Sequence, residues 1–171
     1  MDKGRSISIN AFLSLIDDLT STWKGGESFS VDATVETMKA HGIVLDAPCA
    51  NIEDLLWLLI YYGSNEIPQG RGKNKELVQD GILNSIVLLL EHGADASFCD
   101  DYGQTLLFPS IGTPQPEYCE TLLQHGADVN RADIRGLTFL GYLLYILKYK
   151  NNLYPWLFFD RVIRLFNVLM K

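Results

Sequence analysis

The sequence predicts an all-α protein, a short solenoid of about four antiparallel helix pairs joined by tight turns. Three observations predict this fold. The segment LLEHGAD at residues 89–95 recurs as LLQHGAD at residues 122–128, an offset of 33 residues. The leucine doublets have the spacing of a buried helix face, and a glycine follows each doublet where a helix should end. Units that repeat in this way bury a continuous core by stacking on their neighbours.

The repeat continues beyond these seven residues at the same offset. Four further pairs match: Asp100 with Asp133, Gly103 with Gly136, Thr105 with Thr138, and Leu107 with Leu140. An aspartate followed three residues later by a glycine is typical of the first and last positions of a type I turn. A threonine just before an apolar helical segment is a favourable N-cap. Each copy therefore predicts a turn followed by a helix.

The 33-residue period, with these residues at fixed positions, resembles the ankyrin repeat, a β-turn followed by two antiparallel helices. The resemblance covers residues 81–147. The family's Thr-Pro-Leu-His segment is present in altered form, as TLLF at 105–108 and as TFLG at 138–141. The loss of its proline and histidine weakens the signal for a helix start and leaves the threonine as the cap. The resemblance implies an ankyrin-repeat solenoid with β-turn connections.

The repeat register predicts a single domain, residues 1–171, made of four parts. The parts are an N-terminal capping helix pair at 1–42, a degenerate repeat at 43–93 with an insertion at 63–75, a repeat at 94–126, and a C-terminal repeat and cap at 127–171. The two end parts lack the full motif, as expected of capping units whose outer faces meet water.

The individual helices follow from caps and apolar spacing. Five of them are expected at about residues 8–20, 32–41, 76–92, 138–148 and 155–170. In the degenerate repeat, Asp54 can cap an inner helix that runs through Tyr62. A polar, glycine-rich insertion separates this helix from the outer helix of the same repeat. Within that outer helix, Gly81 marks either a kink or the true start.

Charge is distributed unevenly along the chain. It carries 14 basic and 21 acidic side chains, a net charge of −7. Residues 76–130 contain nine acidic residues and no Lys or Arg, whereas residues 131–171 contain seven basic and two acidic residues. The acidic balance weighs against nucleic-acid binding, which needs clustered Lys and Arg. The acidic block favours a basic protein as the partner.

Targeting and cysteine patterns predict a cytoplasmic protein, of its own cell or of a host cell. No apolar run is long enough to span a bilayer, and no secretory signal follows Lys3 and Arg5. The three cysteines include no C-x-x-C pair and imply no disulfide framework. We expect no membrane association, and whether the chain is a monomer or a dimer stays open.

Neither catalysis nor metal binding is predicted. His41, His92 and His125 each precede a glycine that ends a helix, so a structural role is the simplest interpretation. Cys119 replaces a core aliphatic residue, and no Cys/His pair has the spacing of zinc ligands. No phosphate-binding glycine loop is present, and we expect no cofactor. The alternative that stays open is an enzymatic site built from His92, Cys99 and nearby carboxylates.

The resemblance also implies which positions bind a partner. Ankyrin arrays bind proteins along their concave side, through the turn tips and the exposed face of the inner helices. The matching positions are Asn51, Glu53, Tyr61 and Tyr62 in the first copy; Cys99, Asp101, Tyr102, Gln104 and Thr113 in the second; and Ile134, Arg135, Leu137 and Tyr145 in the third. The insertion at 63–75 is a second candidate, because long insertions in compact repeats are often functional.

The leading functional hypothesis is a non-enzymatic module that binds and inhibits a basic protein through an acidic concave face. One concrete form is an immunity protein that neutralises a nuclease-type toxin. Another is a host-directed bacterial effector or a viral adaptor. A structural role, in which the aromatic C-terminal helix pair forms a dimer face, is a further alternative.

Overall fold

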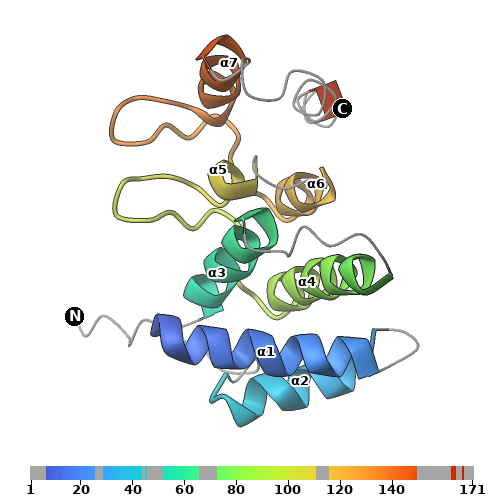
Figure 1. Cartoon of the computed structure of the whole chain (residues 1–171). Coiled ribbons are helices and arrows are strands. Elements are labelled where there is room, and N and C mark those ends of the chain that lie inside the picture. The colour runs from blue at the N-terminus through green and yellow to red at the C-terminus, as the bar shows by residue number, and fades with distance from the viewer. Residues whose placement is uncertain are drawn as a thin grey trace, which may run out of the picture. The chain divides into compact units, whose positions relative to one another are not determined.

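The computed structural model describes residues 7–25, 29–43, 45, 52–65, 73–110, 116–149, 163, 164 and 167. These residues form seven α-helices and no strand, which confirms the all-α class (Figure 1). The chain divides into two compact units, Met1–Asp95 and Ala96–Lys171. In the part of the chain that the structure describes, no helix combines the length and apolar character needed to cross a membrane.

The first unit begins with an antiparallel helix pair, α1 (Ile9–Gly25) and α2 (Val31–Ala40). Ser8 and Ser30 start the two helices, because their hydroxyls accept hydrogen bonds from backbone N–H groups three residues later. One face of α1 is buried and has the spacing of an amphipathic helix; it consists of Phe12, Leu15, Ile16, Leu19 and Trp23. The exposed face of α2 is polar, as expected of a capping helix, and carries a Lys39–Glu36 ion pair of 3.1 Å.

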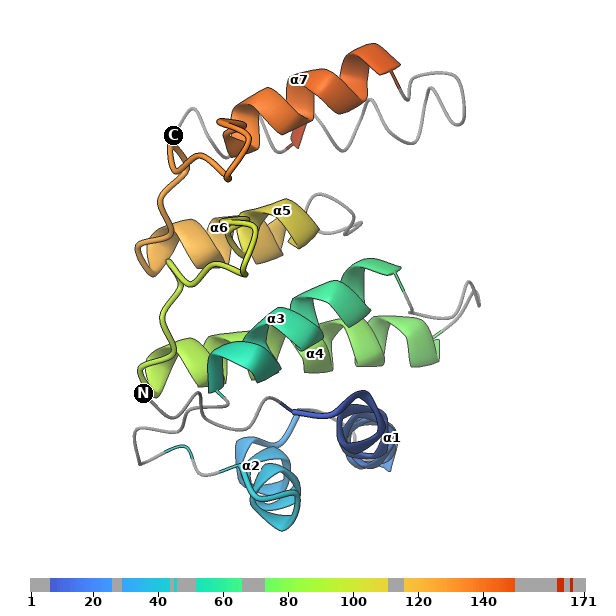
Figure 2. The same cartoon turned by 90° about the vertical axis from the view of Figure 1, so that its left-hand side faces the viewer.

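The second pair of this unit is α3 (Ile52–Asn65) and α4 (Lys73–Glu91), which pack side by side (Figure 2). α1 packs against α4. Both helices of the pair extend into the segment predicted as an insertion, because α3 includes residues 63–65 and α4 includes residues 73–75. The remainder of the predicted insertion, residues 66–72, lies outside the described residues.

Gly81 lies inside α4 and does not start it, so that alternative of the sequence prediction is wrong. Its physical role is to make room for the buried indole of Trp23 from α1. A Cβ atom at position 81 would lie 2.3 Å from Trp23 Cδ2. The indole N–H of Trp23 in turn lies 3.3 Å from the Thr34 hydroxyl on α2. A single side chain therefore links three helices of the unit.

Three helices end with the same backbone geometry at their His-Gly pairs. Gly42, Gly93 and Gly126 have φ values of 79°, 91° and 92°. In each case the residue after the glycine donates its N–H to a carbonyl five residues earlier, at 3.0 Å. This arrangement satisfies the last carbonyls of a helix, and it favours glycine because the left-handed region is strained for other residues. Residues 41–42 therefore end their helix in the same way as residues 92–93 and 125–126 do.

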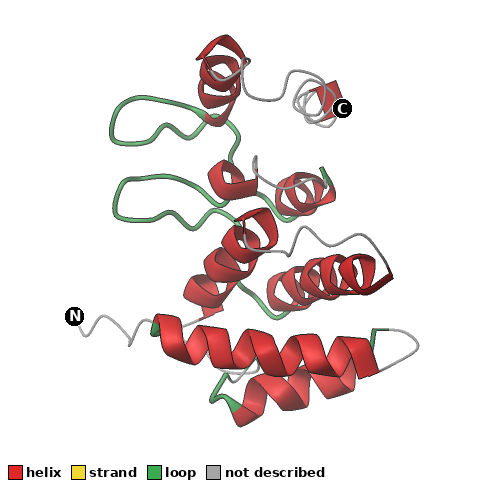
Figure 3. Ribbon diagram, in the orientation of Figure 1, coloured by secondary structure: helices red, strands yellow, loops and turns green. Residues whose placement is uncertain are grey.

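The second unit contains α5 (Leu107–Ser110), α6 (Glu117–Gln124) and α7 (Phe139–Tyr149). Two loops, residues 96–106 and 128–138, precede α5 and α7 and extend in the same direction within this unit (Figure 3). Antiparallel bridges join Cys99 to Thr105 and Ala132 to Thr138 at the bases of the loops. The final predicted helix, 155–170, lies outside the described residues except for helical positions 163, 164 and 167.

Candidate functional site

The structure describes eleven of the thirteen predicted partner-binding residues; Asn51 and Thr113 lie outside it. Three of the eleven belong to the first unit and eight to the second. The first three lie on α3: Glu53, Tyr61 and Tyr62. Seven lie on the two loops: Cys99, Asp101, Tyr102, Gln104, Ile134, Arg135 and Leu137. Tyr145 lies on α7.

The first loop is organised by Asp100. Its carboxylate oxygen Oδ1 accepts hydrogen bonds from the backbone N–H groups of Tyr102 and Gln104, both at 2.9 Å. Its carbonyl accepts a bond of 2.9 Å from the N–H of Gly103, which has a φ of 72°. Because an aspartate here satisfies two N–H groups locally, the turn is held without help from neighbouring helices.

The second loop repeats this geometry 33 residues later, around Asp133. Oδ1 of Asp133 accepts from the N–H groups of Arg135 and Leu137, at 2.8 and 2.9 Å, and its carbonyl accepts from Gly136 N–H at 2.9 Å. Oδ2 adds a bidentate ion pair with the Arg135 guanidinium, at 2.7 and 2.9 Å. The side chain of Leu137 is half-buried.

The ionisation of Asp133 follows from these contacts. Burial of its carboxylate acts to raise the pKa, but the N–H groups of Leu137 and Arg135 and the guanidinium charge of Arg135 outweigh burial. The pKa of Asp133 therefore lies below its ordinary value. Arg135, predicted as a binding residue, already has an internal anionic partner.

The two loops contact each other within the second unit. The N–H of Ile134 donates to the carbonyl of Tyr102 at 3.0 Å. A Cβ atom at position 103 would lie 3.3 Å from the Ile134 nitrogen, so Gly103 permits the close approach. Arg131 bridges the loop bases, donating to the Ser97 carbonyl at 3.1 Å and lying 3.0 Å from Cys99 Sγ. These bonds fix the two loops in position relative to each other.

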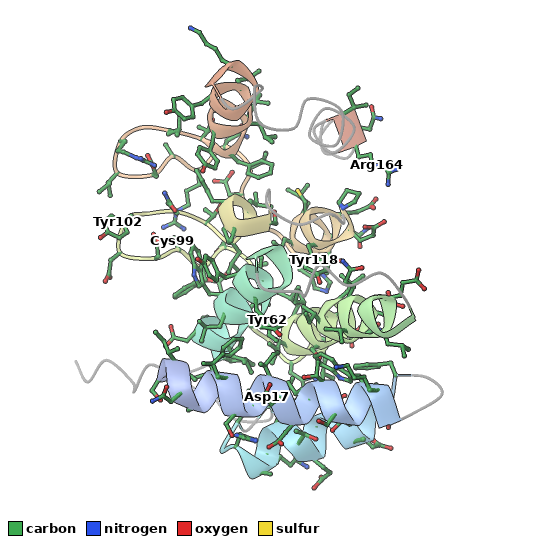
Figure 4. All side chains as sticks on the ribbon, viewed as in Figure 1. Asp17, Tyr62, Cys99, Tyr102, Tyr118 and Arg164 are labelled. Atoms are coloured by element: carbon green, nitrogen blue, oxygen red, sulfur yellow. The ribbon has the colours of Figure 1, made fainter. Side chains whose placement is uncertain are left out.

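The outer ends of these loops expose two large apolar side chains, since Tyr102 is 65% and Ile134 70% exposed. Figure 4 shows Tyr102 at the outer end of its loop and Cys99 closer to the helices. Asp101 is exposed beside Tyr102, and no hydrogen bond or ion pair from the described residues engages its carboxylate. We call Asp101, Tyr102 and Ile134 the tip patch.

Aromatic residues of α5 and α7 form a contact strip in this unit, which runs from the buried Phe108 through the half-buried Tyr142 to the exposed Tyr145. Tyr145 is 50% exposed and stacks on Tyr142, with ring centroids 6.5 Å apart and an interplanar angle of 10°. Tyr142 also contacts Phe108, at 5.5 Å. The residue-by-residue comparison with the repeat family missed Tyr142, although its spacing of three residues from Tyr145 places both on one helix face.

In the first unit the three predicted residues of α3 differ in their surroundings. Tyr61 is exposed, Glu53 is half-buried, and Tyr62 is half-buried with its ring 6.1 Å from Phe12 of α1. Tyr62 therefore contributes to packing as well as to the surface. Near the start of the same helix, burial raises the pKa of Asp54, and a hydrogen bond from the Ile7 backbone only partly opposes it.

The histidines and cysteines have mainly structural contacts. Nδ1 of His92 and of His125 each lies within 2.9 Å of the carbonyl four residues earlier, whereas His41 pairs with Asp18 at 2.8 Å. Cys119 is fully buried, and burial raises the pKa of its thiol to about 12. Among the described residues, no three His, Cys, Asp or Glu side chains are grouped so that they can hold a metal ion. No family model matches the chain.

Proposed function

We propose that this protein is a non-enzymatic protein-binding module, an ankyrin-type array that holds and inhibits a basic partner protein. The observation that carries the proposal is the pair of loops in the second unit. The two loops share one hydrogen-bond pattern at an offset of 33 residues, and they differ in the side chains at their tips. A constant framework with variable tips is what a recognition surface requires.

The exposed tip residues have the composition of an interface. Tyr102 offers an amphipathic ring and Ile134 an aliphatic surface, and both are more than half exposed. Tyrosine is enriched among the residues that dominate binding energies. Monomeric proteins expose scattered apolar residues, but here a main-chain hydrogen bond makes the two exposed residues neighbours on adjacent loops.

The charge of the chain supports a basic partner. Seven of the nine acidic residues in the stretch without Lys or Arg are exposed: Glu76, Asp80, Glu91, Asp95, Asp101, Glu117 and Asp128. They are distributed over helices and loops and do not line one loop, so most of them would act at a distance by attracting the partner. Asp101 is the acidic residue placed to touch it.

The immunity-protein form of this proposal and the effector or adaptor form use the same surface. They differ in genetic context, because an immunity gene should lie beside the gene of the toxin that it neutralises. A toxin gene next to this one supports the inhibitor form, and its absence favours the effector or adaptor form.

Affinity capture from the source cell tests the proposal. The wild-type chain should retain basic proteins at low salt and release them at high salt, and a Tyr102→Ala/Ile134→Ala variant should retain far less. Gln124→Ala, an exposed and uncharged change at the end of α6, is the matched control and should bind as the wild type does. Capture of acidic proteins that resist moderate salt would contradict the electrostatic argument. Capture that is unaffected by the double variant would contradict the role of the loops.

A further inference from the structure

The charged groups around the tip patch differ in whether they are already paired. Both arginines of the second loop have internal partners: Arg135 pairs with Asp133, and Arg131 bonds to the Ser97 carbonyl and lies against Cys99 Sγ. Asp100 and Asp133 each use Oδ1 to hold two backbone N–H groups. Asp128 likewise uses Oδ1 to accept the N–H of Asn130, so Asp101 is the aspartate of the two loops whose carboxylate no hydrogen bond or ion pair from the described residues engages.

We infer that the tip patch binds an arginine side chain of the partner protein, between the Asp101 carboxylate and the ring of Tyr102. The inference rests on the proposed protein-binding function and names the chemical group that the partner presents. An arginine matches each component of the patch. Its guanidinium pairs with a carboxylate and stacks on an aromatic face, and its aliphatic stem packs on an apolar side chain such as Ile134.

Arginine fits this patch better than lysine does. The guanidinium is planar and weakly hydrated, so it can lie flat on Tyr102 while its edge faces a carboxylate. An ammonium group is compact and strongly hydrated, so it loses more favourable hydration than a guanidinium does when it is brought against an aromatic ring. The nearby Arg135 does not oppose a second guanidinium strongly, because the bidentate contact with Asp133 balances its charge.

The patch is organised before binding. The backbone of Tyr102 is held on both sides, by its N–H bond to Asp100 Oδ1 at 2.9 Å and by the bond from Ile134 N–H to its carbonyl at 3.0 Å. A tyrosine side chain loses little rotational freedom when it is fixed, and its backbone here is already ordered. Binding therefore needs little reorganisation of the loops.

Nuclear magnetic resonance of the full chain with labelled isoleucine methyl groups tests the inference. The probe is the acetylated, amidated peptide Gly-Ser-Gly-Arg-Gly-Ser-Gly, and its matched control carries citrulline, the neutral isostere, in place of arginine. The arginine peptide should shift the Ile134 methyl signal and saturate, and the citrulline peptide should shift it far less. Ile9, which is 72% exposed in the first unit, provides an internal control and should not respond.

Two variants separate the contribution of the Asp101 charge from that of the Tyr102 ring. Asp101→Asn should weaken binding of the arginine peptide about threefold, the size expected of an exposed ion pair. Tyr102→Ala should weaken it about fivefold through loss of the cation–π contact and its area. Equal shifts from the arginine and citrulline peptides, or equal affinity of the Asp101→Asn variant, would overturn the inference.

The same variants distinguish this inference from the proposed function. If the arginine peptide fails to bind but Tyr102→Ala still abolishes capture of the partner protein, the arginine inference is wrong and the proposed function stands. If no tip variant affects capture of the partner, the arginine inference and the proposed role of the loops are both wrong, although binding of a basic partner stands.

Discussion

At the scale of single residues, two positions in this molecule differ from what the local helix preferences of their residues would predict. Gly81 is a poor helix former inside α4, and Thr105 has the sequence of an N-cap but a hydroxyl that finds no hydrogen-bond partner among the described residues. Both features depend on tertiary surroundings. We therefore expect Gly81→Ala to lower stability, although glycine to alanine usually stabilises a helix. We also expect Thr105→Val not to lower stability, although the loss of an N-cap hydroxyl usually does.

Replacement of Gly81 by alanine should destabilise the protein. In a helix interior this change normally stabilises, but here the new Cβ would meet the Trp23 indole at 2.3 Å. We expect a loss of about 2 kcal/mol in the free energy of unfolding, the usual cost of overpacking. Gly25→Ala, with no atom within 4 Å of the new Cβ, is the control and should cost nothing. Urea denaturation measures both, and a more stable Gly81→Ala variant would contradict the packing described here.

The two threonines at the same repeat position should respond differently to valine. The Thr138 hydroxyl accepts a bond from Gly141 N–H at 3.2 Å, whereas the Thr105 hydroxyl is buried and has no partner in the part of the chain that the structure describes. Thr138→Val should therefore cost about 1 kcal/mol of stability. Thr105→Val removes an unsatisfied buried hydroxyl and should leave stability unchanged or raise it by up to about 1 kcal/mol. Equal losses in the two variants, measured by thermal and urea unfolding, would argue against this difference.

At the scale of elements, two acidic residues lie in contrasting environments: Asp133 organises its loop, whereas Asp54 lies inside α3 and is not the N-cap that the sequence predicted. The carboxylate of Asp133 is buried inside its own loop and stabilised as an anion by N–H groups and a guanidinium. The carboxyl group of Asp54, near the start of α3, is disfavoured as an anion by burial. The two groups should therefore contribute to stability with opposite dependence on pH.

The signs follow from linkage between protonation and folding. The pKa of Asp133 is lower in the folded chain, so its contribution is present above its unfolded pKa and is lost as pH falls through the folded value. The pKa of Asp54 is higher in the folded chain, so its ionised form opposes folding at neutral pH and this effect disappears in acid. Asp54→Asn should raise stability at pH 7 and have no effect near pH 3, where the carboxyl is protonated in both states.

Asp133→Asn is the matched variant for this measurement. It should lower stability at pH 7, and its difference from the wild type should shrink as pH falls into the acid range. Urea midpoints at a series of pH values check both variants. Parallel stability curves for wild type and either variant would contradict the assignment.

Features that depend on neighbouring residues could be predicted from the sequence, whereas contacts between elements could not. The turns around Asp100 and Asp133 and the helix ends at the His-Gly pairs were predictable, because they depend on residues a few positions apart. The contact between Trp23 and Gly81 was not, since a glycine inside a helix gives no indication of the side chain that covers it. The pairing of Arg135 with Asp133 was not predicted either, because the family resemblance gives Arg135 only as a partner-binding position.

At the scale of the whole molecule, the net charge of −7 bears on the proposed binding of a basic partner, where it should act mainly on the rate at which the two proteins approach each other. Charges at the rim of an interface change association rates, and charges inside the contact change dissociation rates. Most of the exposed acidic residues lie on helices, whereas Asp101 lies in the tip patch. The two groups should therefore affect different steps of binding.

Amide substitutions at exposed acidic residues that do not belong to the tip patch should slow association with the proposed basic partner, by about tenfold at low salt. The set consists of Glu76, Asp80, Glu91, Glu117 and Asp128. Dissociation should be nearly unchanged in this variant, whereas Asp101→Asn should mainly accelerate dissociation. Surface plasmon resonance with the captured partner at several salt concentrations measures both rates. A faster dissociation in the five-site variant would contradict this division.

The main-chain hydrogen bond between Ile134 and Tyr102 has a further consequence, which concerns how the recognition surface can change by mutation. The loops hold their shape through main-chain groups, two aspartates and their glycines, and none of the bonds that fix them uses the side chains at 101, 102 or 134. These three positions can therefore mutate without disturbing the fold that presents them. The same loops can serve as a scaffold onto which other tip sequences are grafted to select binders of new targets.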